Sequence, residues 1–579
     1  MLRKMIAPVF ACGLVAAAVA APQTGAEKID TAMNAKIRAE GTERSQVMRI
    51  VHVLTDLYGP RLTGSPNFNN SAKWAIAEME SWGLRNGRLH EWNWGREGWL
   101  NERASGHIVS PVKDNLIFEV LAWTPSTQGT VTARAVHLVP PTGPQAPAPP
   151  AQEGGGGGGR GRGGQGGPSF LGPTEEELNA YFAEIAPKVK GGIVLVGSAA
   201  VPRFIEVENA KRREDEAARR QYNPDPNAPD AGRGGRGGRG GGGRGGGRGA
   251  GQPAEGPARL SNNQVNQRVA QFLRDSGAAI RLNDAGRRHS QIVAFSGGNY
   301  DSSRTLPTVV LGNEGFGRIA RLIADGHDVT LEFTIQNRIY PNAQTSYNAI
   351  AEIPGTDKAD EVVMLGGHLD SWHSSTGATD NAIGCAIMME AVRILQTVGA
   401  KPRRTIRVGL WGGEEQGLLG SQAYVRDTFG TFENPKPAHA KFNGYWNIDS
   451  GTGLVRGVSV FGPPDAARIL AQFVKPWEDF KIYGAVTSSS RNIGGTDHTS
   501  FSNAGLPGIG TGLDTIEYGS HTHHTNLDSY ERILPDDVMK NAVITASVVY
   551  HLAMREELLP RFTKEQMPPL PAGRGGGGQ

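Results

Sequence analysis

The strongest constraint on the fold is a region in which short apolar runs alternate with longer helical patterns. Between residues 345 and 450, apolar runs with strand character are separated by stretches that repeat apolar residues at helical spacing. Strands that alternate with helices in this way favour a mostly parallel sheet covered on both faces. We therefore predict an α/β fold with a mixed, mostly parallel sheet flanked by helices, closed by a helix that begins at Pro535. The predicted strands are 346–355, 360–368, 405–413 and 441–449, and the predicted helices are 380–399 and 418–430.

Residues of the types that bind metals stand at the ends of these runs. Because the carboxyl ends of parallel strands meet at one edge of a sheet, we expect the side chains to converge there. Each of them alone is typical of a solvated surface residue, but five ligand-type residues at strand ends are hard to explain in that way. Histidine nitrogens and carboxylate oxygens suit zinc, and two neighbouring ions usually share a carboxylate. The candidate ligands are His368, Asp380, Glu415, Asp449 and His524.

Two further acids have predicted roles beside these ligands. Adjacent side chains on an extended segment diverge, so Glu414 would not share the metal of Glu415, and we expect it to be the general base. Asp370 lies two residues after His368, where its carboxylate would accept the imidazole N–H and fix the orientation of the ring. Asp380 heads a predicted helix after a small-residue turn, so it could bridge the two ions.

The runs GGHLDSW, GATDNAIG, WGGEEQGLLGS, NIDSGTG and HHTNLD resemble the five metal-site motifs of the di-zinc aminopeptidase and glutamate-carboxypeptidase family. The resemblance covers about 45 to 562 apart from the Gly/Arg-rich stretches, and it is strongest to the plasma glutamate carboxypeptidase branch of that family. It implies a zinc exopeptidase fold with two Zn2+ per chain and Glu414 as base and proton shuttle. It also implies that Asp380 bridges, that His368 and Asp449 bind one ion, and that Glu415 and His524 bind the other.

Three more residues receive roles only through this resemblance. His523 occupies the place of a tyrosine that steadies the oxyanion in related carboxypeptidases, which implies that His523 donates to the oxyanion, unless it is a solvated loop histidine. Asp497 and His498 lie on a Gly-rich loop that by resemblance faces the substrate. The alternative is that Asp497 only holds its loop through backbone hydrogen bonds.

The remaining segments predict a second domain and several flexible parts. The strand and helix patterns between 100 and 335 resemble an inserted protease-associated α+β domain, whereas 22–99 and 336–562 would form the peptidase domain. Gly/Arg-rich stretches at about 141–168 and 223–256, and the tail 563–579, lack the apolar residues needed for a core, so we expect disorder there. Residues 1–21 have the basic start, short apolar run and small-residue cleavage site of a signal peptide.

Charge and cysteine content limit the possible partners and the compartment. The formal net charge is only +3, so the overall charge does not indicate that the protein binds nucleic acid or an anionic membrane. The Arg-Gly repeats contain no aromatic residues on which bases could stack. Cleavage after residue 21 would leave Cys385 alone, so no internal disulfide is possible. We therefore expect a secreted or periplasmic protein with no membrane segment in its mature form.

The predicted function is hydrolysis of peptide bonds in short peptides or dipeptides by metal-activated water. Dipeptidase or aminopeptidase activity is the first choice, because the arginine pair that would mark specificity for acidic carboxyl termini is not evident. Carboxypeptidase activity is the second choice. The other alternative is a non-catalytic binding protein of transferrin-receptor-like architecture. The partner is thus a peptide, and the family resemblance favours a homodimer.

Overall fold

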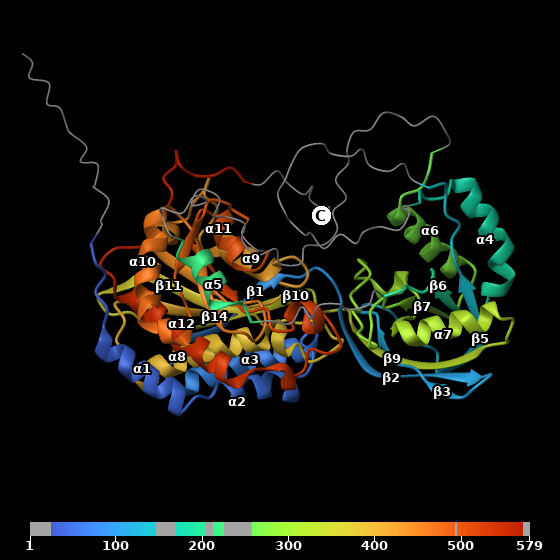
Figure 1. Cartoon of the computed structure of the whole chain (residues 1–579), viewed down its shortest axis with the longest axis horizontal. Coiled ribbons are helices and arrows are strands. Elements are labelled where there is room, and N and C mark those ends of the chain that lie inside the picture. The colour runs from blue at the N-terminus through green and yellow to red at the C-terminus, as the bar shows by residue number, and fades with distance from the viewer. Residues whose placement is uncertain (1–24, 146–169, 203–211, 225–257, 493–494, 571–579) are drawn as a thin grey trace, which may run out of the picture.

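The computed structural model shows two domains side by side (Figure 1). The signal peptide, most of both Gly/Arg-rich stretches and the end of the tail fall outside the residues that the structure describes. The described residues are 25–145, 170–202, 212–224, 258–492 and 495–570.

A mixed sheet forms the centre of the larger domain. Among the described residues it has eight strands, in the order β1-β10-β12-β11-β13-β16-β14-β15. The four central strands, β12, β11, β13 and β16, are parallel, whereas β1 and β10 are antiparallel additions at one edge. The predicted mixed α/β sheet flanked by helices is confirmed. The strands are β1 (Arg85–Asn93), β10 (Thr345–Ile353), β11 (Lys358–His368), β12 (Arg404–Trp411), β13 (Phe442–Asn447), β14 (Val455–Phe461), β15 (Ala485–Ser488) and β16 (Gly508–Leu513).

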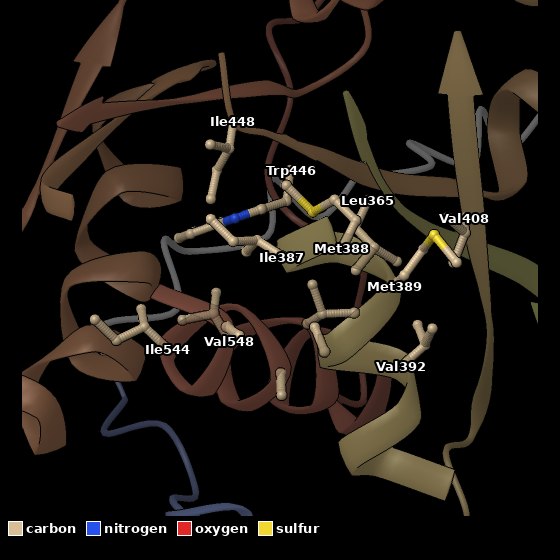
Figure 2. Close-up of a cluster of buried hydrophobic side chains, with 14 of the residues drawn as sticks. Leu365, Ile387, Met388, Met389, Val392, Val408, Trp446, Ile448, Ile544 and Val548 are labelled. Carbon is tan, nitrogen blue, oxygen red and sulfur yellow. The ribbon is translucent and has the colours of Figure 1, made fainter. Parts of the chain in front are cut away.

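Helices cover both faces of this sheet. Helix α8 is apolar around most of its circumference, and it is buried between the sheet and α12. Figure 2 shows Trp446 and Ile448 from the sheet side meeting Ile387 of α8 and Ile544 and Val548 of α12. The helices on this face are α1 (Thr31–Glu43), α2 (Val47–His52), α3 (Pro66–Ser81), α8 (Ile383–Thr397), α10 (Pro464–Val474) and α12 (Pro535–Met554); those on the other are α9 (Leu419–Thr428) and α11 (His498–Asn503).

The second domain is inserted between β1 and β10 and has a sheet of its own. Its parallel strands β5 to β8 are covered by α4 and α6 on one face and by α7 on the other. An inserted domain is therefore present, while its identity as a protease-associated domain stays a prediction. Its elements are β2 (Gly98–Ser110), β3 (Asp114–Asn115), β4 (Phe118–Val120), β5 (Thr130–Leu138), α4 (Glu175–Val189), β6 (Ile193–Val196), α6 (Asn262–Asp275), β7 (Ile280–Asp284), β8 (Thr308–Leu311), α7 (Asn313–Ala324) and β9 (Thr330–Tyr340).

A short segment that lies within the second domain in sequence binds to the larger domain instead. Residues 212–224, here called the strap, include α5 (Asp215–Tyr222), which packs on β14. The Tyr222 ring lies so close to Gly457 and Gly512 that a Cβ atom at either position would overlap it. The backbone N–H of Arg213 donates to Asp514 Oδ1 over 3.0 Å. Glycines on the sheet therefore form the surface on which the strap rests.

None of the helices in the described residues combines the length and the apolar character that a bilayer crossing needs.

Candidate metal centre

The candidate ligands come from the carboxyl ends of the parallel strands. His368 is the last residue of β11, and Asp449 follows β13 by two residues. Glu415 lies in the turn between β12 and α9, and His524 lies in the loop after β16. Asp380 lies in η3 (Ala378–Ala382), the turn that leads into α8, and its φ and ψ angles of −135° and 82° are not helical. Five segments between residues 368 and 524 thus meet at one edge of the sheet, where open α/β sheets bind their ligands.

Asp380 stands at the centre of the group. Its Oδ1 atom is 3.3 Å from Nε2 of His368, and its Oδ2 atom is 3.1 Å from Nε2 of His524. Asp449 Oδ1 lies 3.4 Å from His368 Nε2, and Glu415 Oε2 lies 2.9 Å from His524 Nε2. The structure therefore brings all five predicted ligands together as two groups that share Asp380. Their role as zinc ligands stays a prediction.

The charges in this group favour a cation at its centre. Burial alone would raise the pKa of Asp380, but His524 and His368 outweigh it and hold that pKa well below its ordinary value. Burial lowers the pKa of His524, but the charges of Glu415 and Asp380 outweigh it and raise the pKa to about 11. Asp380 Oδ2 and Glu415 Oε1 are buried and accept no hydrogen bond. Carboxylate oxygens that accept no hydrogen bond, next to two imidazole nitrogens, form a set of ligand atoms that suits zinc ions.

Asp370 lies beside His368, but the structure differs from the prediction in how the two are connected. The acceptor for Nδ1 of His368 is the backbone carbonyl of Asp370, at 2.8 Å, whereas the nearest Asp370 carboxylate oxygen is 3.8 Å away. The Asp370 carboxylate instead accepts the backbone N–H groups of Glu414 and Glu415, at 3.1 and 3.3 Å, and the Thr63 hydroxyl at 3.0 Å. Asp370 therefore orients both sides of the site, the imidazole through its backbone and the glutamate pair through its side chain.

Glu414 lies among other acids beside the proposed ligands, and its role as general base stays a prediction. Burial raises the pKa of its carboxyl group well above the ordinary value, and the charges of Asp449, Asp497 and Glu415 add to this effect against the opposing charge of His368. A carboxyl group that holds its proton more tightly than usual is a better base when ionised.

His523 is stacked on His524 at the open side of the site. The two ring centroids are 3.7 Å apart, His523 Nε2 is 3.9 Å from Asp380 Oδ2, and 30% of the His523 side chain is exposed. Sequence reasoning missed the neighbouring Tyr518, whose hydroxyl donates to Asp449 Oδ1 over 3.5 Å. No local pattern marks Tyr518, because it stands six residues before His524 and reaches the site only through the turn of the loop.

Asp497 and His498 are not on the open side of the site. Their side chains are 0% and 4% exposed, at the start of α11. Burial raises the pKa of Asp497 to about 7, and the charges of Asp449 and Asp370 add to the effect. Both residues are therefore buried next to the proposed ligands, and their contact with a substrate stays a prediction.

Two further residues hold the backbone of the ligand-bearing loops. The Asp528 carboxylate accepts the backbone N–H groups of Thr379, at 2.6 Å, and Asp380, at 3.1 Å. The buried guanidinium of Arg61 donates to the carbonyls of Leu369, at 2.8 Å, and Gly377, at 2.9 Å. Both lie in runs that resemble family motifs, HHTNLD and GPRLTGSPN, yet no spacing rule predicts that they act on backbone groups.

Comparison with known proteins shows a similarity to one family of peptidases over part of the chain. A model of Peptidase family M28 matches residues 348–549. Over this segment the chain is therefore similar to peptidase family M28. All five proposed ligands and Glu414 fall within the M28 segment, whereas Arg61 and the second domain lie outside it.

Relatives extend the likeness beyond the M28 segment. The chain is 31% identical over 261 residues to carboxypeptidase Q of Rattus norvegicus, covering 45% of this chain and 52% of the relative. It is 34% identical over 255 residues to leupeptin-inactivating enzyme 1 of Streptomyces exfoliatus, covering 40% and 53%. The chain thus spans about half the length of the curated relatives it matches. A solved M28 peptidase precursor from Shewanella amazonensis, 20% identical, matches 94% of this chain and 99% of its own with a TM-score of 0.58, which shows a shared fold.

Proposed function

We propose that the chain is a zinc-dependent exopeptidase that hydrolyses dipeptides or other short peptides. The proposal rests on the gathering of four other candidate ligands around Asp380, together with buried carboxylate oxygens on Asp380 and Glu415 that accept no hydrogen bond. The match of residues 348–549 to the model of Peptidase family M28 supports the same chemistry. Two zinc ions, if bound by the two ligand groups, would polarise the scissile carbonyl and lower the pKa of a water.

Residues around the proposed metal ligands would transfer the proton, position the glutamates and bind the oxyanion. Glu414 accepts the proton of the attacking water and returns it to the leaving amine, which its raised pKa favours. Asp370 keeps Glu414 and Glu415 in place through their backbone N–H groups. His523 and Tyr518 are at the open side of the site, and either can donate a hydrogen bond to the oxyanion.

A panel of dipeptides with free, amino-blocked and carboxyl-blocked ends tests this proposal, with and without a chelator. Hydrolysis that requires a free amino end and stops with chelator supports aminopeptidase or dipeptidase activity. Hydrolysis that requires only a free carboxyl end supports the second candidate, carboxypeptidase activity, which the carboxypeptidase Q relatives favour. Glu414→Gln should lower kcat at least about 100-fold while zinc remains bound. No hydrolysis of any peptide by zinc-loaded protein would contradict the proposal.

We further propose that the protein is exported and acts as a homodimer. The export proposal rests on residues 1–21, which lie outside the described residues. A fusion of these residues to a reporter enzyme that is active only outside the cytoplasm tests export, and light scattering of the purified protein tests the dimer.

A further inference from the structure

The turn between β12 and α9 carries Glu414 and Glu415 and is closed where its two ends meet. Residues 412–420 form this turn, here called the glutamate turn. The backbone N–H of Gly420 donates to the carbonyl of Gly412 over 2.9 Å. A Cβ atom at Gly420 would lie 2.2 Å from that carbonyl oxygen, so only glycine allows the two ends to approach this closely. The position of both glutamates therefore depends on what holds these ends.

One side chain, that of Asn348 on β10, binds both ends of the glutamate turn. Its Oδ1 atom accepts the backbone N–H of Gly412 over 3.0 Å, and its Nδ2 atom donates to the carbonyl of Gly420 over 2.9 Å. All three residues are buried, so neither backbone group could replace Asn348 by water without a change in the packing. The two hydrogen bonds therefore fix the ends of the turn to the sheet.

Asn348 and Asp370 hold different parts of the same turn. The Asp370 carboxylate accepts the backbone N–H groups of Glu414 and Glu415, which lie in the middle of the turn. Asn348 binds the two ends, and it does so only through backbone groups of the turn. The two side chains together fix the backbone on both sides of the glutamates as well as at the glutamates themselves.

The partners of the Asn348 amide also fix its orientation. Because Oδ1 accepts one backbone N–H and Nδ2 donates to a carbonyl, the second hydrogen of Nδ2 is left for Nδ1 of His90, 3.1 Å away. His90 lies directly opposite Asn348 on β1. Its ring proton is then on Nε2, which is 3.6 Å from Asp427 Oδ2 on α9. Burial lowers the pKa of His90 against the opposing charge of Asp427, which favours this neutral ring.

We propose that Asn348 is a positioning residue, which places Glu414 and Glu415 by holding both ends of the glutamate turn. Without the amide, the glycines at the ends lose their partners, and the turn gains freedom to shift. A shift of about 1 Å in a catalytic group can cost about 100-fold in rate. The effect through Glu414 rests on the proposed peptidase function, whereas the effect through Glu415 concerns zinc binding alone.

The test compares Asn348→Ala with wild type by two measurements. Zinc affinity, measured by competition with a chromogenic chelator, should fall about tenfold or more, because Glu415 is no longer held in place. At saturating zinc, kcat on a dipeptide should fall about tenfold or more, because Glu414 is displaced as well. KM should stay within about twofold of wild type, since the buried Asn348 side chain does not reach a bound peptide.

Asn443→Ala is the matched control for a loss of stability without a loss of positioning. Asn443 is also completely buried, on β13 of the same sheet. Its Oδ1 atom accepts the backbone N–H of Leu559 over 2.6 Å, and its Nδ2 atom donates to the carbonyl of Leu552 over 2.9 Å. Urea unfolding of metal-free protein should show similar losses in Asn443→Ala and Asn348→Ala. Only Asn348→Ala should lose zinc affinity and kcat.

His90→Phe tests the same inference if Asn348→Ala does not fold. Phenylalanine keeps a ring beside Tyr424 but accepts no hydrogen bond from Asn348, so zinc affinity should fall about threefold, as for the loss of one hydrogen bond. If wild type binds zinc but hydrolyses no peptide, the proposed function fails while the zinc comparison still tests Asn348. Zinc affinity and kcat in Asn348→Ala equal to those of Asn443→Ala, or wild-type affinity in His90→Phe, would overturn the inference.

Discussion

The acidic residues of the site perform two different tasks, and only the structure separates them. Asp380, Glu415 and Asp449 present carboxylate oxygens to the two imidazoles, whereas Asp370 and Asp528 use theirs to bind backbone N–H groups. These ligand types were predictable because His368, Glu415 and Asp449 closely follow recognisable strands and Asp380 precedes a recognisable helix. The roles of Asp370 and Asp528 as acceptors of backbone N–H groups were not predictable, because hydrogen bonds between loops follow from tertiary geometry and not from sequence spacing.

The role of Asp528 leads to a prediction about metal affinity. Asp528→Asn leaves every proposed ligand in place but removes one of the two acceptors that hold the backbone of Thr379 and Asp380. Zinc affinity, measured by competition with a chromogenic chelator, should fall about tenfold or more. Asp536→Asn, at an exposed position on α12, should have no effect. Equal affinity in Asp528→Asn and wild type would show that this carboxylate does not orient the site.

His373, at the junction of the two domains, should make stability depend on pH. Its Nε2 atom is 2.6 Å from the Val120 carbonyl, and burial lowers its pKa to about 4. The unfolded chain binds this proton below a pH of about 6.5, so between about 6.5 and 4 it holds more protons than the folded protein does. Stability is therefore lost as the pH falls through this window, by about 2 kcal/mol between pH 7 and pH 5.

His373→Gln tests this pH dependence because glutamine can still donate to Val120 but does not titrate. Urea unfolding of metal-free protein at pH 7 and pH 5 should show a smaller loss of stability in the variant, by about 2 kcal/mol. The same loss in both proteins would exclude His373 as the source.

At the scale of elements, the strand and helix alternation was predictable, and the position of the strap was not. Helix α8 and strand β11 have patterns that follow directly from burial on a sheet. The glycines under Tyr222 belong to separate strands, β14 and β16. Only the folded sheet brings Gly457 and Gly512 to one surface.

Gly512→Ala tests how tightly the strap is bound. Its Cβ atom would overlap the Tyr222 hydroxyl group, and such overpacking costs about 1–3 kcal/mol. Urea unfolding should show this loss in the free energy of unfolding of Gly512→Ala. Tyr222→Ala should lower the free energy of unfolding less in the Gly512→Ala background than in wild type, because removal of the Tyr222 ring also removes the clash. Strictly additive losses would mean that the strap does not rest on Gly512 in solution.

At the scale of the whole molecule, the site is built from both domains. The M28 segment carries every proposed ligand, but Gln291, Ile292 and Phe295 come from the inserted domain and contact the His524 loop. This contribution could not be predicted, because it depends on how the second domain is placed against a loop more than 200 residues further along the chain.

Deletion of residues 231–251 should leave peptidase activity within about twofold of wild type. This Gly/Arg-rich stretch contains no His, Asp or Glu, so it offers zinc none of the donors that such sites use. Steady-state kinetics on one dipeptide tests the deletion, and a large loss of kcat would mean that the stretch takes part in the reaction.

The most direct test of the account is the zinc content of the purified protein, measured by mass spectrometry of metals in wild type and in Asp380→Ala. A shared carboxylate at the centre of two ligand groups predicts about two zinc ions per wild-type chain and fewer than about one in the variant. Wild-type protein that binds no zinc, or an Asp380→Ala variant that keeps both ions, would contradict the account.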